Sequence, residues 1–248
     1  MGAKIIAHCL VHFLYNCGCA KYYMLCMLAA LFSRRAPMHI PSSFRQSDPE
    51  TLLAFVQAYP LATLVVTAEG QLHAHHLPFL VRSEAGKQTI ASHINRANKI
   101  WQTCQDGDEI LLIFTGPDCY VSPNFYPSKQ RDGKAVPTWN YSAVHVRGTI
   151  RFVHQAKWIL EFLAELSDHH EQQHQAKPWT MEDAPDGFIE KLCKAVVGIE
   201  VTIESIEGQM KYSQNKTSED FSGVVTGLSQ GNEQQRLVAK SMVALEDS

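Results

Sequence analysis

The sequence has no excess of basic residues, few cysteines in its longer part and no common nucleotide-binding loop. Residues 38–248 hold 18 Lys or Arg (22 in the chain less four in residues 1–37) against 25 Asp or Glu, which argues against a nonspecific nucleic-acid-binding protein. The same residues hold three irregularly spaced cysteines, so we expect no disulfide framework and a cytoplasmic protein. Neither Gly-x-Gly-x-x-Gly nor Gly-x-x-x-x-Gly-Lys occurs, which removes the usual dinucleotide and P-loop sites.

The proportions of apolar and charged residues are those of an ordinary globular protein. Of its 248 residues, 45% are apolar and 19% are charged, which excludes a disordered chain, a collagen and a disulfide miniprotein. No internal repeat and no clear linker interrupts residues 38–230. We therefore predict one domain over 38–230, followed by a C-terminal helix or tail over 231–248.

Residues 1–37 differ from the rest of the chain. They carry four basic residues, no acidic one and four of the seven cysteines, and residues 5–32 are mostly apolar. Arg34 and Arg35 follow the apolar run, which is the wrong order for a signal peptide. We interpret 1–37 as a non-native or membrane-like extension: sequence upstream of a true start at Met38, with a membrane anchor and a genuine structured extension as alternatives.

The rest of the chain predicts several strands connected by short turns, with helices between them. Ser47, with Glu50 three residues later, is typical of a helix N-cap, and Pro60 ends that helix. A loop with four prolines is expected over 115–138. The expected strands are 61–67, 71–77, 79–82, 88–93, 109–114, 141–153 and 198–206, and the expected helices are 49–59, 97–104, 155–175, 184–196, 218–228 and 233–245. The pattern predicts an α+β fold, a β-barrel with peripheral helices.

Three polar segments are candidate binding sites. Residues 92–101 read as a strand end, a turn and a helix start, where Arg96, Asn98 and Lys99 could hold a phosphate, or where the asparagines simply cap a helix. In residues 136–145, Trp139 and Tyr141 share one face of a predicted strand and could enclose a planar ligand to which Asn140 would hydrogen-bond, or they could be core and interface aromatics. Residues 211–215 form a third polar cluster, with simple turn chemistry as its alternative.

Histidine pairs raise the question of a metal ion. His73 and His75 share one face of a predicted strand, and His170 and His174 are one helical turn apart. Neither pair has an obvious third ligand, so we predict no metal site.

Taken together, ordered motifs over residues 38–228 resemble the PaiB family of FMN-binding negative transcriptional regulators. The motifs include His93-x-x-Arg96-Ala-Asn98, Pro137-Thr-Trp-Asn-Tyr141, Val197-Gly198 and Lys211-x-Ser-Gln-Asn215. The resemblance implies an FMN-binding split β-barrel like that of pyridoxamine-phosphate oxidases and flavin reductases. It also implies a homodimer with FMN near the subunit interface. We expect no membrane partner for residues 38–248. The expected cofactor-binding residues are His93, Arg96, Asn98, Lys99, Trp139, Asn140, Lys211, Gln214 and Asn215.

Two functions from different classes remain open, with a passive flavin carrier or a structural dimer as a third alternative. The first is a PaiB-type regulator, although the sequence shows no basic recognition helix and no helix-turn-helix signature, so that direct DNA binding has little support. The second is an FMN-dependent oxidoreductase on the same barrel, in which the flavin supplies the redox chemistry. One departure from the family pattern is Lys99, which stands where the resemblance leads us to expect proline.

Overall fold

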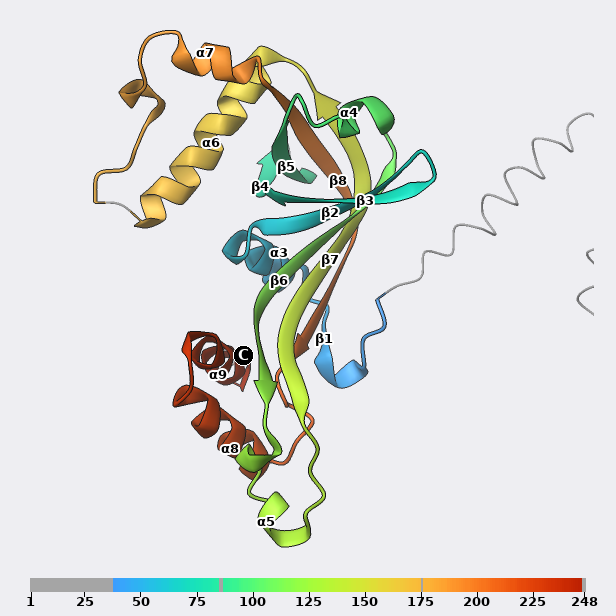
Figure 1. Ribbon diagram of the computed structural model, residues 1–248, viewed down its shortest axis with the longest axis vertical. Coiled ribbons are helices and arrows are strands. Elements are labelled where there is room, and N and C mark those ends of the chain that lie inside the picture. Colours follow the sequence, from blue (N-terminus) through green and yellow to red (C-terminus); the bar gives the residue numbers. More distant parts are fainter. Residues whose placement is uncertain (1–37, 85–86, 175, 247–248) are drawn as a thin grey trace, which may run out of the picture. The chain divides into compact units, whose positions relative to one another are not determined.

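The computed structural model describes residues 38–84, 87–174 and 176–246 (Figure 1). The chain divides into two units, Met1–His39 and Ile40–Ser248, and the strands and helices of the described residues all belong to the second. The predicted extension over 1–37 lies outside the described residues. The strands are β1 (Arg45–Gln46), β2 (Leu61–Ala68), β3 (Gln71–Pro78), β4 (Leu80–Glu84), β5 (Lys87–Asn95), β6 (Glu109–Val121), β7 (Thr138–Val153) and β8 (Val196–Lys211). The α-helices are α3 (Pro49–Ala58), α4 (Ile100–Thr103), α5 (Lys129–Asp132), α6 (Ala156–His174), α7 (Phe188–Cys193), α8 (Ser218–Ser229) and α9 (Glu233–Glu246), and the 3-10 turns are Ser42–Phe44, Pro123–Phe125 and Met181–Asp183.

The strands form one antiparallel sheet in the order β3-β2-β6-β7-β8-β5-β4, and β1 pairs with β8. Its two outer strands, β3 and β4, follow one another in the chain with only the buried Phe79 between them. A single bent segment therefore connects both edges of the sheet. The predicted α+β class, a split β-barrel with peripheral helices, is confirmed.

Residue alternation explains how the sheet encloses a core. On β2, Ala62, Leu64 and Val66 are buried and face the interior, while the intervening residues are more exposed. The hairpin from β2 to β3 turns at Glu69 and Gly70, both with positive φ (53° and 74°), as a type I′ turn requires. The predicted hairpin is confirmed.

The predicted loop over 115–138 is wrong at its start, because β6 continues to Val121. The register between β6 and β7 shifts between Thr115 and Asp118, so that one extra residue is accommodated in β6. Pro117 lies within this bulge, where proline costs no ladder hydrogen bond. The irregular connection is thus shorter, residues 122–137.

Four further boundaries differ from the sequence predictions. Asp48, not Ser47, caps α3, because its Oδ2 accepts the Thr51 N–H at 2.8 Å. The helix predicted over 97–104 is the four-residue α4, and the one predicted over 184–196 is limited to α7. The strand predicted over 198–206 extends at both ends to become β8. Pairing with β5 and β7 stabilises the added residues, whose sequence alone favours a strand only weakly.

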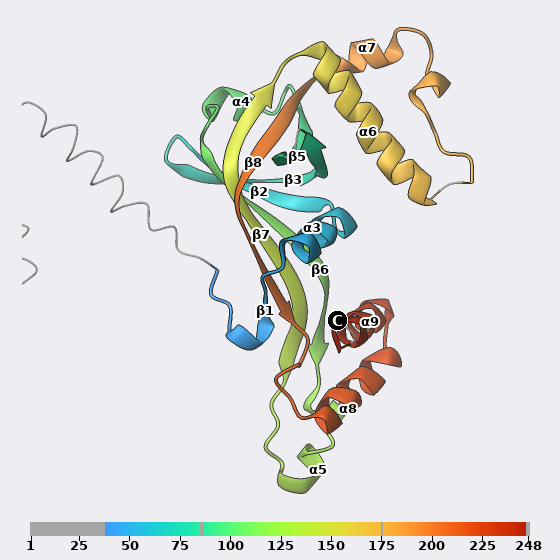
Figure 2. The same ribbon diagram turned by 180° about the vertical axis from the view of Figure 1, so that it is seen from behind.

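The helices lie at different parts of the sheet. Figures 1 and 2 show α6 and α7 near the start of β8. They show α8 and α9 beside the end of β6 and the start of β7. Val238, Ala239 and Met242 of α9 are buried in the main core, so the C-terminal helix packs within the same unit. Among the described helices, none is long and apolar enough to cross a membrane.

Candidate functional site

The nine predicted site residues fall into two groups at opposite ends of β8. The first group surrounds the start of the strand, where Asn95 pairs with Val196 and the Arg96 N–H donates to the Ala195 carbonyl at 2.8 Å. The second group lies where β8 ends at Lys211. Sixteen residues of extended chain separate these ends by about 50 Å along the strand. Within one subunit, the two groups therefore cannot contact the same small ligand.

In the first group, the Arg96 guanidinium makes contacts within the protein. Its Nε donates to the Lys194 carbonyl at 3.0 Å and its Nη2 donates to the Val196 carbonyl at 2.9 Å. The group also lies over the Trp101 ring, 5.6 Å from its centroid. Arg96 thus connects the end of β5 to the start of β8. It also lines a cavity of about 460 Å³ that includes His154 and Cys193.

The other residues of this group make local contacts. Asn98 Oδ1 accepts the Ile100 N–H at 3.2 Å, and Asn98 Nδ2 lies 3.2 Å from His75 Nδ1. Lys99 is exposed and precedes α4, which is too short to carry a useful dipole. The structure thereby connects Asn98 to His75, a residue to which the sequence analysis assigned no flavin contact.

His93 is half-buried beneath α6. Its ring lies 6.0 Å from that of Phe162, and burial lowers the pKa of the imidazole. Its Nδ1 has no hydrogen-bond partner among the described residues. Burial against Phe162 of α6 therefore disfavours the protonated form of His93.

In the second group, Trp139 and Asn140 point to opposite faces of β7. The Trp139 side chain is 48% exposed, donates from Nε1 to Asp118 Oδ1 at 3.0 Å and lies edge-on to Tyr120. Asn140 is completely buried and exchanges hydrogen bonds with Ser213 Oγ at 3.0 and 3.1 Å. Of these two predicted residues, Trp139 is thus the one available to a ring stacked on the outer face of the sheet.

A small cavity of about 130 Å³, which we call the Lys211 pocket, lies at the end of β8. It is lined by residues 136–138, Asn140, Lys211, Ser213, Asn215 and Lys216. Lys211 Nζ donates to Thr138 Oγ1 at 2.7 Å, and burial, then the charge of Lys216, lowers the pKa of Lys211. Lys216 was not predicted, although its position directly after the 211–215 motif was the available signal.

Gln214 does not line the Lys211 pocket. Its Oε1 accepts the Tyr212 N–H at 2.7 Å and its Nε2 donates to the Met210 carbonyl. These bonds stabilise the tight turn after β8, in which Ser213 has a φ of 65°. The turn directs Asn215 and Lys216 toward the pocket.

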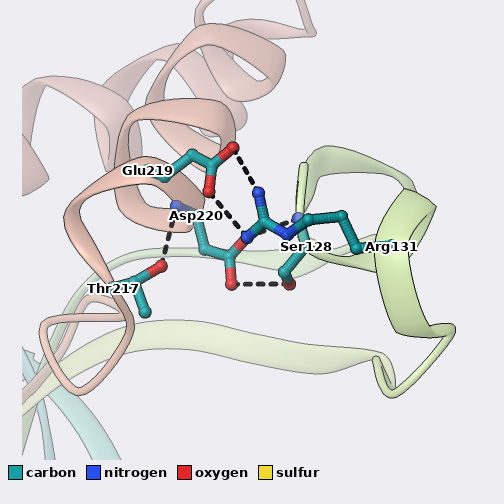
Figure 3. Close-up of polar contacts among 5 residues, drawn as sticks. All are labelled: Ser128, Arg131, Thr217, Glu219 and Asp220. Atoms are coloured by element: carbon teal, nitrogen blue, oxygen red, sulfur yellow. Dashed lines mark hydrogen bonds and ion pairs between the residues drawn. The ribbon is translucent and has the colours of Figure 1, made fainter.

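Residues 136–138, which form one wall of the Lys211 pocket, follow a loop that is attached to the start of α8. Figure 3 shows this attachment. Asp220 accepts the Ser128 N–H at 3.0 Å and the Ser128 hydroxyl at 2.8 Å. Arg131 Nη1 donates to Glu219 Oε1 at 2.8 Å, and its Nη2 lies 2.7 Å from Glu219 Oε2. We call these two contacts the α8 clasp.

Two hydrolase-like motifs in the sequence were not predicted as sites. Residues 170–174 have the spacing His-Glu-x-x-His, but Glu171 accepts the Trp179 N–H at 2.9 Å, and no group of three metal-ligand residues occurs among the described ones. Residues 227–231 have the spacing Gly-x-Ser-x-Gly, but Ser229 ends α8 and donates to the Val225 carbonyl at 2.7 Å. A nucleophile elbow requires a strand-to-helix turn, which is absent there.

Comparison with known proteins identifies related sequences. Residues 38–205 match a family described as "Putative FMN-binding domain", a range that ends before Lys211. The chain is 29% identical over 191 residues to "Protease synthase and sporulation protein PAI 2" of Bacillus subtilis, covering 77% of this chain and 89% of that protein. It is 36% identical over 225 residues to an uncharacterized protein of Emericella nidulans, covering 77% and 90%. A solved structure of a conserved hypothetical protein from Mycobacterium tuberculosis shares the fold, with a TM-score of 0.50, 12% identity and coverage of 73% and 94%.

Proposed function

This chain belongs to the PaiB-type family of FMN-binding proteins, and from that premise we propose that it is a homodimeric negative regulator of transcription that holds FMN between its subunits. The observation that supports the dimer is the separation of the two groups of predicted binding residues by the length of β8. In a dimer with two-fold symmetry, the Arg96 end of one subunit can lie beside the Trp139 and Lys211 end of its partner. Each of two equivalent FMN sites then draws on both chains.

The exposed aromatic residues agree with this arrangement. Trp139 and Tyr120 form an edge-on pair on the outer face of β6 and β7, and both are about half-exposed. Large aromatic side chains that remain exposed in one subunit are typical of a surface covered by a partner or a ligand. We propose that Trp139 contacts the flavin there and that His93, Arg96, Asn98 and Lys99 approach the same flavin from the other subunit.

We expect the protein to be a dimer with one FMN per subunit. Multi-angle light scattering at micromolar concentration should give twice the chain mass of 27.8 kDa, and flavin absorbance should give a stoichiometry of one per chain. A monomer that still binds one FMN tightly would show that one group of residues is sufficient, and would contradict the shared site.

The regulatory role rests on the family resemblance, and the charge of the chain suggests how it is exercised. The compact unit is acidic, with 18 basic against 25 acidic residues over 38–248, so phosphate contacts provide little attraction to DNA. We propose a cytoplasmic regulator that acts without reading DNA directly. Its three described cysteines are free and buried, as is usual in a reducing compartment.

We expect no mobility shift of promoter DNA, even at low salt, and no bleaching of the bound flavin by NADH or NADPH. A shift that disappears steeply with added salt would show direct DNA binding. Rapid bleaching by a pyridine nucleotide would instead favour the FMN-dependent oxidoreductase.

A further inference from the structure

The connection between α6 and α7 forms one side of a surface groove of about 440 Å³, which we call the α6–α7 groove. It is lined by Leu160 of α6 and by residues 181–182, 184–187 and 189–190. Figures 1 and 2 show that this connection stands away from the sheet. None of the nine predicted flavin-binding residues lines the groove, so it is separate from the proposed FMN site.

The segment that builds the groove exposes much apolar surface. Of the eleven large apolar side chains that are exposed among the described residues, four belong to α6, α7 and their connection, namely Leu160, Trp179, Phe188 and Leu192. Leu160 lines the groove itself, and Ile189 adds a second large apolar side chain to its lining. Apolar side chains that remain exposed in one region are typical of a surface that contacts another molecule.

The charged side chains that line the groove are all acidic. They are Glu182, Asp186 and Glu190, and no Lys, Arg or His is among the lining residues. The whole stretch 178–190 contains four acidic residues and no basic one. Glu182 and Asp186 are exposed, and neither takes part in the ion pairs that join described residues. A positively charged group that approaches the groove is therefore attracted.

Hydrogen bonds hold the connection in place. The Trp179 N–H donates to Glu171 Oε2 of α6 at 2.9 Å, which attaches the connection to that helix. The Thr180 N–H donates to Asp183 Oδ2 at 2.8 Å and closes a capping box at the next turn. A groove that is already formed loses little conformational entropy when it binds a partner.

These properties select one kind of occupant. An amphipathic segment of a protein can place apolar side chains against Leu160 and Ile189 while its Lys or Arg side chains reach Glu182 and Asp186. Nucleic acids and anionic membrane surfaces carry the same sign of charge as the groove and are repelled. A second copy of the compact unit is a poor match, because that unit is itself acidic.

We propose that the α6–α7 groove binds a basic, apolar segment of a partner protein. The inference rests on the proposed function for its role, because a regulator with little attraction to DNA has to act through another protein. Complementary charge brings the partner to the groove, and burial of its apolar side chains keeps it there.

The first test measures the fluorescence anisotropy of a labelled helical peptide of leucine and lysine, about 14 residues or four turns long, added to the full chain. Glu182→Gln/Asp186→Asn should weaken binding about 3- to 10-fold, the loss expected for two surface charge pairs. Glu50→Gln/Glu233→Gln neutralises two exposed carboxylates of α3 and α9 and is the matched control. It should bind the peptide as wild type does.

The second test removes an apolar contact. Leu160→Ser should weaken binding of the same peptide about 5- to 10-fold, because the variant buries less apolar area against it. Leu237→Ser of α9 is the matched control, since both leucines are 40% exposed before substitution. Its affinity for the peptide should equal that of wild type.

The remaining outcomes would overturn the inference. If wild type does not bind the peptide at low salt, or binds a leucine and glutamate peptide equally well, the groove does not select basic segments. If the groove variants and their controls weaken binding equally, the peptide responds only to the overall charge and surface of the chain. If a groove variant halves the mass found by light scattering, the groove is a subunit interface. FMN stoichiometry and the DNA mobility assay test the proposed function separately, because neither measurement involves the peptide.

Discussion

Replacing Gly148 by valine should lower the free energy of unfolding by about 3 kcal/mol, because β7 and β8 approach too closely for any side chain there. A Cβ on Gly148 would collide with the Thr202 carbonyl oxygen and lie 3.0 Å from Val201 Cγ1. The register between β7 and β8 shifts between Arg147 and Gly148, which brings the two backbones together. The obstacle is steric, since Gly148 does not have a positive φ.

The backbone has little freedom to relieve this collision. Thr202 pairs with Thr149 on one side and with Thr89 on the other, so β8 is held between two strands at that position. Any displacement of Thr202 therefore disturbs the hydrogen bonds to both neighbouring strands.

Urea unfolding followed by tryptophan fluorescence measures the loss in the free energy of unfolding. Thr149→Val, which places valine on the next, half-exposed position of the same strand, should change stability by less than about 1 kcal/mol. Equal stability of Gly148→Val and wild type would show that the two strands can separate locally.

Replacing Asp220 by alanine should cost about 2 kcal/mol, because it breaks the buried half of the α8 clasp. The Asp220 carboxylate accepts two hydrogen bonds from Ser128, and its loss leaves a part-buried backbone N–H without its acceptor. Glu219→Ala is the matched control on the neighbouring residue. It removes only the Arg131 ion pair, whose two side chains are 59% and 50% exposed, and should cost less than about 1 kcal/mol. Comparable losses in the two variants would contradict this difference.

The contribution of Asp220 should also depend on pH. The hydrogen bond from the Ser128 N–H, with further stabilisation from the Ser128 hydroxyl, lowers the pKa of Asp220 in the folded protein. A lowered folded-state pKa stabilises the fold above the unfolded value of about 3.9, and this stabilisation is lost as the pH falls through the folded value. The stabilities of wild type and Asp220→Ala should therefore converge in acid and differ most near neutrality. A constant difference over that range would mean that the carboxylate charge is irrelevant.

The fold was largely predictable because the local signals and the tertiary contacts agree. The alternation in 61–67 and 71–77 and the turn between them match the observed hairpin. The errors occur where tertiary pairing overrides local composition. Pro117 suggested a loop, yet β6 continues past it, since a bulge opposite β7 accommodates the proline.

The sequence indicated which residues are candidates for the site, but not how these residues are arranged in space. The motif around Arg96 suggested a free guanidinium at a helix start, whereas α4 is four residues long and Arg96 donates to two carbonyls across 98 and 100 residues of sequence. Lys216 was overlooked because its proximity to Lys211 comes from the turn at Ser213 with its positive φ. No local spacing rule indicates which lysines share a cavity.

By itself, the sequence determined the family, the cofactor class and the α+β barrel, because these depend on ordered motifs and on short-range periodicity. The tertiary structure alone decided that the predicted binding residues form two groups at opposite ends of β8, and that Trp139 and Asn140 face opposite sides of β7. It also decided that Lys211 and Lys216 share a cavity. These properties depend on strand length, register and the path of the chain between distant segments, which no local pattern encodes.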